Sequence, residues 1–236
     1  MNSQRAKSHL TRKHWNEFAR VALQSVDLSG QVLMKYQLGK ARSRNPVKLK
    51  GRNDLVTGAD LESCRVMKQH LKRFHPTHSF LAEEPEFSEN NRSDFLWIID
   101  PLDGTTFHNR GLPFFSSILA LEVRGQTELG LVSSPFTGDV FLAGLGRGCT
   151  FWNRRLRKRR QVKVSGVTNL ADVLVGYSYG RVSNMRGIWQ RLWVDCFQCA
   201  EPLCVLGARK SVTWLLARAM LLSTTIQRLG ILPLWP

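Results

Sequence analysis

Five consecutive apolar residues, Phe95-Leu-Trp-Ile-Ile99, run directly into the segment Asp100-Pro-Leu-Asp-Gly-Thr-Thr106. Bulky and β-branched side chains without a polar break are typical of a strand that is buried on both faces. Proline, glycine and the polar residues that follow favour a turn. The sequence therefore predicts a buried strand that delivers two carboxylates, Asp100 and Asp103, to its carboxyl end.

Two carboxylates this close on a tight turn can point into one crevice, where they repel each other. A divalent cation relieves the repulsion, and ligands that are all oxygen favour Mg²⁺, Ca²⁺ or Mn²⁺ over zinc. Glu83, after the preceding predicted strand, would reach the same crevice, and Thr105 and Thr106 would add hydroxyl groups. The competing interpretation is that Asp100 and Asp103 are solvated turn residues, one of which caps the next segment.

Periodic patterns elsewhere predict helices and further strands. Apolar residues at three- and four-residue steps indicate amphipathic helices over residues 15–26 and 66–74, and Pro76 stops the second. Between them we predict a basic loop over residues 40–52. Strands are predicted at 78–82, 115–123, 128–132, 139–143 and 161–165, with turns at 124–126 and 144–148.

Composition excludes several classes of protein. With 236 residues, 43% of them apolar, the chain is too hydrophobic to be disordered, and five cysteines do not make a disulfide framework. No apolar stretch is long and uncharged enough to cross a membrane. We expect a cytoplasmic protein, although the basic residues 1–20 also resemble an organelle transit peptide.

The net charge of +16 is concentrated at the two ends. Residues 1–60 carry 12 Lys and Arg against 4 Asp and Glu, and residues 151–236 carry 14 against 3, which gives net charges of +8 and +11. Such ends predict polyanion binding without sequence preference. The basic run at 154–160 fits a nucleic-acid patch or the exposed tip of a hairpin, and we favour the hairpin. No aromatic residue lies within it, so a stacking platform is not expected.

At Trp97-Ile-Ile-Asp-Pro-Leu-Asp-Gly-Thr-Thr106 the sequence resembles the inositol monophosphatase family of metal-dependent phosphatases. Further motifs follow in the family's order: Asp54-Leu-Val-Thr-x-x-Asp60, His78-Ser-Phe-x-x-Glu-Glu84, Gly111-x-Pro-x-Phe115, Ser117-Ile-x-x-Ala-Leu121, Gly130-x-Val132, Gly146-x-Gly148 and Val164-Ser165. Several ordered motifs are stronger evidence than any one of them. The resemblance implies an α/β fold, the αβαβα sandwich of that family. An N-terminal lobe (residues 1–152) would carry the metal site, and residues 153–236 would form a C-terminal lobe.

The resemblance implies a Mg²⁺ site. Glu83, Asp100, Asp103 and the backbone carbonyl of Leu102 would be its ligands, and Asp100 would bridge two ions. Metal ions would then generate hydroxide for an in-line attack on a phosphomonoester and stabilise the leaving alkoxide.

The same resemblance implies roles around the substrate. Thr105, with Glu83 behind it, would orient the attacking water, and Asp60 would support the site. The backbone N–H groups of Gly104 and Thr105 would hold the phosphate at the start of a helix.

The sequence also departs from the family's pattern. Ala82 replaces a glycine, Phe107 replaces an asparagine, and a basic run stretches the hairpin after Asn153. The family's later P-W-D supplies an aspartate to the second metal, whereas Pro233-Leu-Trp-Pro236 has none. We therefore expect an incomplete C-terminal lobe and impaired activity.

The leading expectation is a Mg²⁺-dependent hydrolase of a small phosphomonoester, with inositol monophosphate first and with histidinol phosphate and other sugar phosphates left open. The alternative is a non-catalytic family member that binds RNA or a protein complex through its basic ends. Intact Glu83, Asp100, Asp103 and Thr105 favour the enzyme, and the missing aspartate favours the alternative. The oligomeric state, a homodimer included, is left open.

Overall fold

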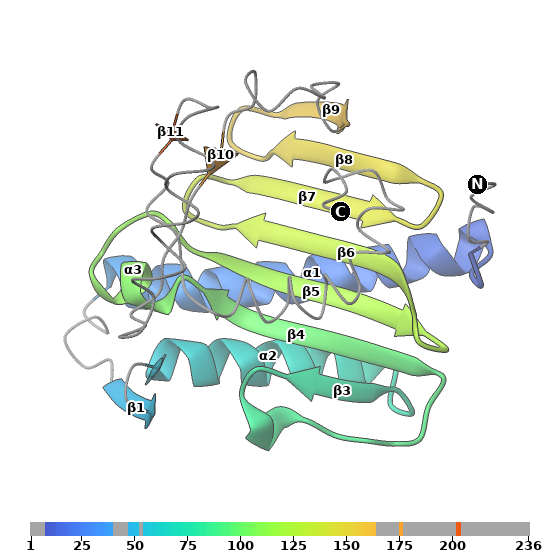
Figure 1. Cartoon of the computed structure of the whole chain (residues 1–236), viewed down its shortest axis with the longest axis horizontal. Coiled ribbons are helices and arrows are strands. Elements are labelled where there is room, and N and C mark those ends of the chain that lie inside the picture. Colours follow the sequence, from blue (N-terminus) through green and yellow to red (C-terminus); the bar gives the residue numbers. More distant parts are fainter. Residues whose placement is uncertain (1–7, 40–46, 52–53, 164–174, 177–201, 204–236) are drawn as a thin grey trace.

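The computed structural model describes residues 8–39, 47–51, 54–163, 175–176 and 202–203 (Figure 1). Its helices are α1 (Arg12–Leu38), α2 (Gly58–Phe74), the 3-10 helix η2 (Pro85–Phe87) and α3 (Thr105–Asn109). Its strands are β1 (Val47–Gly51), β2 (Asp54–Thr57), β3 (Ser79–Ala82), β4 (Phe95–Asp103), β5 (Ser116–Val123), β6 (Gln126–Ser134), β7 (Asp139–Gly144), β8 (Gly148–Asn153), β9 (Lys158–Val162), β10 (Val175–Gly176) and β11 (Pro202–Leu203).

Seven strands form one mixed sheet in the order β3-β4-β5-β6-β7-β8-β9. From β4 onward each strand pairs antiparallel with the next, whereas β3 and β4 are parallel. Ala82 at the end of β3 lies opposite Ile99 of β4. Because parallel strands end at the same edge of a sheet, Glu83 and Asp100 follow side by side at that edge.

Helices α1 and α2 pack together on one face of this sheet, and Figure 1 shows both running behind it. Trp97 and Ile99 of β4 contribute to the core on the helix side. Ile98 packs on the opposite face against Ala120 of β5. The strand is therefore buried on both faces, as its uninterrupted apolar sequence predicts.

The predicted helices and most strands are confirmed, but several elements differ. Helix α2 begins at Gly58, before the predicted residue 66, and strand β2 was not predicted. Helix α1 runs well beyond residue 26, to Leu38. A strand, β1, occupies the end of the predicted basic loop, where the alternation Val-Lys-Leu-Lys over residues 47–50 is the period-two signal that the charge obscured. Strand β8 was not predicted, because it is a short segment between a glycine-rich turn and the basic run, and these two features determined how the sequence was interpreted there.

The basic run lies at the β8–β9 hairpin, as predicted. Arg154 to Arg157 form the turn, Lys158 to Arg160 lie in β9, and all seven residues from 154 to 160 are exposed. The sheet therefore continues through residue 162, past the predicted lobe boundary at 152/153. Of the predicted C-terminal lobe, the short parallel pair β10–β11 is described, while Val164-Ser165 and Pro233–Pro236 lie outside the described residues. The lobe division stays a prediction. None of the described helices is long and apolar enough to cross a membrane.

An aromatic cluster joins α1 to the amino-terminal ends of β3 and β4, with the ring of Phe18 on α1 lying 4.9 Å from that of His75. The rings of His75 and His78 stack at 4.7 Å, and His78 also stacks on Phe95 at 4.5 Å. The indole N–H of Trp97 donates to Nδ1 of His78 at 3.1 Å, which requires that nitrogen to be unprotonated. Burial, with the nearby His75, lowers the pKa of His78 to about 4.

We expect His78 to make folding sensitive to acid. Its folded pKa of about 4 lies below its ordinary value of 6.5, so the unfolded chain binds more protons as the pH falls from 6.5 to 4. The stability that wild type holds over His78→Gln should therefore shrink across that range. Denaturant titrations of both proteins at several pH values measure this difference, and a difference independent of pH would contradict the assignment.

Candidate functional site

The two aspartates of the motif are brought together by an irregularity in β4. Residues three positions apart on a regular strand point to opposite faces. The register shifts between Asp100, which lies opposite Ile118, and Asp103, which lies opposite Ser116, so β4 carries one residue more than β5. Such a bulge re-aims side chains, and it allows both carboxylates to approach one side. Pro101 lies in the bulge, where it has no N–H to offer the ladder.

A buried network of hydroxyl groups holds this bulge in place. Ser117 on β5 and Ser29 on α1 place their Oγ atoms 2.9 Å and 3.3 Å from the carbonyl oxygen of Pro101. The two hydroxyl oxygens lie 2.7 Å apart, and both serines are fully buried. The network therefore links β4 to the neighbouring strand β5 and to helix α1.

Four carboxyl groups surround the carboxyl end of β4. Burial raises the pKa of Asp100 well above its ordinary value. The negative charges of Glu83 and Asp103, a hydrogen bond between the Asp100 and Glu83 carboxyl groups, and the charge of Asp60 raise this pKa further. Oδ1 of Asp100 accepts the Leu102 N–H at 3.2 Å, whereas its buried Oδ2 has no N–H or O–H donor among the described residues. The site thus favours a proton or a cation that offsets the charge of these carboxyl groups.

These carboxylates have the chemistry of a hard-cation site, but the described side chains are not yet arranged as ligands. Among the residues that the structure describes, no three His, Cys, Asp or Glu side chains converge closely enough to hold a metal ion. An all-oxygen set with an orphaned buried carboxylate oxygen nevertheless fits a divalent ion such as Mg²⁺. Binding would require the carboxylates to turn toward a common point.

Asp60 connects the start of α2 to the motif. The N–H and hydroxyl of Thr57 both donate to Oδ2 of Asp60, so Asp60 completes the helix cap. Its other oxygen, Oδ1, lies 3.0 Å from the hydroxyl of Thr105, which is also 3.1 Å from the Leu102 carbonyl. Burial raises the pKa of Asp60 to about 7, an effect that the hydrogen bonds from Thr57 and Thr105 oppose and the charge of Glu84 increases.

Gly104 is required by the backbone that follows Asp103. Its φ of 90° lies in the left-handed region, and an added Cβ would sit 2.5 Å from the carbonyl oxygen of Phe114. Helix α3 begins at Thr105, as the phosphate-binding prediction needs, but it has only five residues. The role of the Gly104 and Thr105 N–H groups toward phosphate stays a prediction.

The structure places every predicted site residue at this edge of the sheet. Glu83, Asp100, Asp103 and Asp60 interact electrostatically, and Thr105 bonds to Asp60. Ser29 and Ser117 were not predicted. Their hydroxyl groups bond a backbone carbonyl that is distant in the sequence, and such a contact produces no recognisable motif or residue spacing. Thr57 was also missed, although Thr-x-x-Asp before an apolar-periodic segment is a capping signal.

The chain matches the family model described as the inositol monophosphatase family over residues 14–192. Among curated relatives, "Nus factor SuhB" of Vibrio cholerae is 40% identical over 167 residues, which are 68% of this chain and 62% of the relative. "Inositol-1-monophosphatase" of Rhizobium meliloti is 34% identical over 156 residues, 66% of this chain and 56% of the relative. The chain thus spans about three fifths of the length of such relatives.

Solved structures share the fold. The extragenic suppressor protein suhB of Bartonella henselae is 26% identical with a TM-score of 0.72, over 81% of this chain and 71% of the other. The IMPase of Thermotoga maritima is 26% identical with a TM-score of 0.68, over 81% and 69% of the two chains. The predicted α/β fold class is therefore confirmed.

Removing one hydroxyl from the bulge network tests whether the network stabilises the site. Ser117→Ala deprives the Pro101 carbonyl of a buried donor, and we expect the free energy of unfolding to fall by about 1–3 kcal/mol. Ser133→Ala is the matched control, because Ser133 is a buried serine on β6 directly opposite Ser117 and outside this network. Denaturant unfolding measures both, and equal losses would show that the network adds nothing.

Proposed function

Because the chain belongs to the inositol monophosphatase family, we propose that it is a divalent-metal-dependent phosphatase acting on a small phosphomonoester. The observation that carries the proposal is the bulge in β4 between Asp100 and Asp103, beside which the charges of Glu83 and Asp103 both act on Asp100. The relative of Rhizobium meliloti named inositol-1-monophosphatase supports inositol monophosphate as the first substrate. Other sugar phosphates are the next class to test.

The proposed metal is Mg²⁺, held by Glu83, Asp100, Asp103 and the Leu102 carbonyl. When bound, a divalent ion lowers the pKa of a water ligand and stabilises charge on phosphate oxygens. A distant relative of the fold, an IMPase/NADP phosphatase with a TM-score of 0.65, was solved with Mg²⁺ and phosphate, which is in line with such a site. The excess of carboxylates around Asp100 is the feature of this chain that a cation would compensate.

In this proposal the chain's own residues position water and phosphate. The Thr105 hydroxyl is held between the Asp60 carboxylate and the Leu102 carbonyl, so its oxygen lone pairs are directed rather than free to rotate. A hydroxyl fixed in this way can accept a hydrogen bond from a water molecule and orient it. Glu83 would accept the proton of that water, and the N–H groups of Gly104 and Thr105 would receive the phosphate oxygens.

The expected impairment of activity stays a prediction. It rests on the sequence around Trp235, which lies outside the described residues. The chain spans about three fifths of the length of its curated relatives. Its substrate and its turnover are therefore to be measured on this chain itself and are not taken from the relatives.

Replacing the central aspartate tests the phosphatase proposal. Asp100→Asn keeps the size of the side chain but removes its charge, and we expect loss of Mn²⁺ binding in calorimetry together with loss of Mg²⁺-dependent phosphate release from inositol 1-phosphate. Asp94→Asn is the control, because Asp94 is an exposed acid that pairs with Arg124 away from the site. Binding and release equal to wild type in Asp100→Asn would overturn the assignment.

A second candidate function is non-catalytic binding of a polyanion, for which the β8–β9 hairpin provides the observation. Neighbouring strands supply the aromatic rings that the basic run lacks: Arg160 lies 5.3 Å over the Phe151 ring, which contacts Phe141 at 4.9 Å. Phe141 remains 41% exposed. Relatives named Nus factor SuhB also favour a role beyond phosphate hydrolysis.

Salt dependence tests this second function. We expect labelled oligothymidylate to bind with an affinity that falls steeply with salt concentration, and Arg160→Gln to weaken binding and lower the salt slope by about one. Arg73→Gln removes an exposed charge on α2 and should change less. Fluorescence anisotropy gives both quantities. Salt-independent affinity, or a strong preference for one sequence, would contradict the proposal.

A further inference from the structure

Glu83 lies at the start of a short loop whose two ends are pinned together. Its own N–H donates to the carbonyl of Ile99 at 3.0 Å, and the chain then turns through η2. The loop closes where Glu89 returns beside Phe80, with backbone hydrogen bonds of 2.7 and 2.8 Å. Inside this closure, the N–H of Ala82 donates to Oγ of Ser88 at 3.0 Å. Glu83 and Glu89 therefore lie at the two ends of one short closed loop, the first bonded to β4 and the second to β3.

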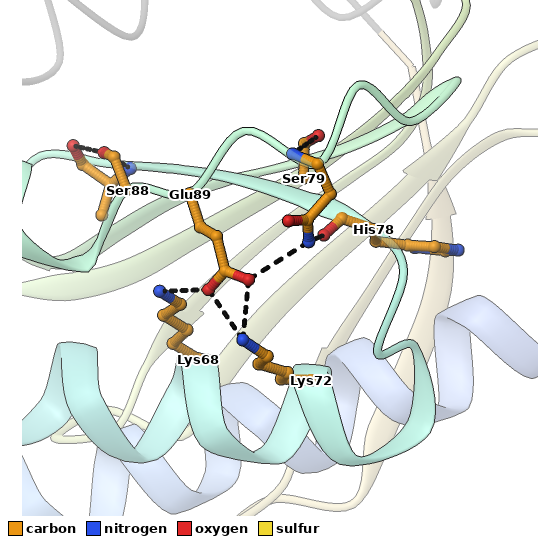
Figure 2. Close-up of polar contacts among 8 residues, drawn as sticks. Lys68, Lys72, His78, Ser79, Ser88 and Glu89 are labelled. Carbon is orange, nitrogen blue, oxygen red and sulfur yellow. Dashed lines mark hydrogen bonds and ion pairs between the residues drawn. The ribbon is translucent and has the colours of Figure 1, made fainter.

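Residue 89 is held by an ion-pair cluster on α2 (Figure 2). The Nζ atom of Lys72 lies 2.7 and 2.9 Å from the two carboxylate oxygens of Glu89, and Nζ of Lys68 lies 2.9 Å from one of them. The side-chain amide of Asn91 adds a bond at 3.2 Å. These hydrogen bonds, from Lys72 first and then Lys68, lower the pKa of Glu89 to about 2.

The cluster is more than a solvated pair. The Lys68 side chain is only 17% exposed, and its ammonium lies 5.6 Å from the centre of the Phe80 ring. Lys68 and Lys72 are one helical turn apart, so they present two cations on one face of α2. An isolated surface ion pair contributes little to stability, but several donors on one partly buried carboxylate fix a geometry.

Helix α2 also carries Asp60 in its first turn, where Asp60 bonds to Thr105. Asp60 and Lys68 are eight positions apart, which is about 12 Å along the helix. One rigid helix thus sets the place of Asp60 directly and the place of the Glu83 loop through Glu89.

We infer that Glu89, clamped by Lys68 and Lys72, is a positioning residue that holds Glu83 toward Asp100. Among the described residues, the Glu89 carboxylate bonds to Lys68, Lys72 and Asn91, so it acts on Glu83 through the closed loop of residues 83–88. The inference rests on the proposed metal-dependent function for its effect on cation binding. Its effect on the loop is independent of that function.

Neutralising Glu89 is the test. In Glu89→Gln we expect amide hydrogen exchange at residues 83–88 to be faster than in wild type, and Mn²⁺ affinity in calorimetry to fall about tenfold, as for other partners of metal ligands. Global unfolding in denaturant should change little, because the cluster lies at the surface. Asp94→Asn is the control, since it removes an ion pair of similar length, 2.8 Å to Arg124, that lies outside residues 83–88.

The two measurements separate the possible failures. Unchanged exchange at 83–88 in Glu89→Gln would overturn the inference, whatever happens to Mn²⁺. Faster exchange with unchanged Mn²⁺ affinity would also overturn it, because the loop would then not position a ligand. Failure of wild type to bind Mn²⁺ would defeat the proposed function, while faster exchange in the variant would still support the clamp. The double substitution Glu89→Lys with Lys72→Glu restores a pair of opposite charges and should recover part of the protection.

Discussion

One extra residue in β4 determines the arrangement of the candidate site. Side chains of a regular strand alternate between its two faces, so without the bulge at Pro101 and Leu102 the side chains of Asp100 and Asp103 would point to opposite faces. The bulge is stable because its disturbed backbone finds donors elsewhere: the Pro101 carbonyl receives the hydroxyls of Ser117 and Ser29. The carbonyl group of Pro101 therefore links the bulge in β4 to both strand β5 and helix α1.

The electrostatics of the site follow from this arrangement. Burial and neighbouring carboxylates raise the pKa of Asp100, and burial raises that of Asp60 to about 7. Both raised values mean that the folded chain tolerates these groups best when a proton or a cation offsets their charge. In the proposed function, a divalent cation would offset this charge. The Thr105 hydroxyl, held by Asp60 and the Leu102 carbonyl, would orient the water that the cation activates.

Much of this could be predicted from sequence, because the strongest signals were local. The uninterrupted run before Asp100 identified the buried strand, and the ordered motifs identified the family. The bulge, by contrast, depends on the register in which β4 pairs with β5. The sequence of either strand alone does not determine that register. The aromatic rings beside the basic run were also not predicted, because Phe151 lies in β8 and Phe141 in β7, outside the run itself. The clamp on Glu89 joins side chains seventeen residues apart in the chain, for which no periodicity exists.

The most direct test of the central claim is a crystal structure of the chain grown with Mn²⁺ and measured for anomalous scattering. The account predicts an anomalous peak at about 2.0–2.3 Å from carboxylate oxygens of Asp100 and Asp103, with Glu83 turned toward it. Well-ordered carboxylates with no peak between them, or a peak bound elsewhere, would contradict the claim that the bulge in β4 builds a cation site.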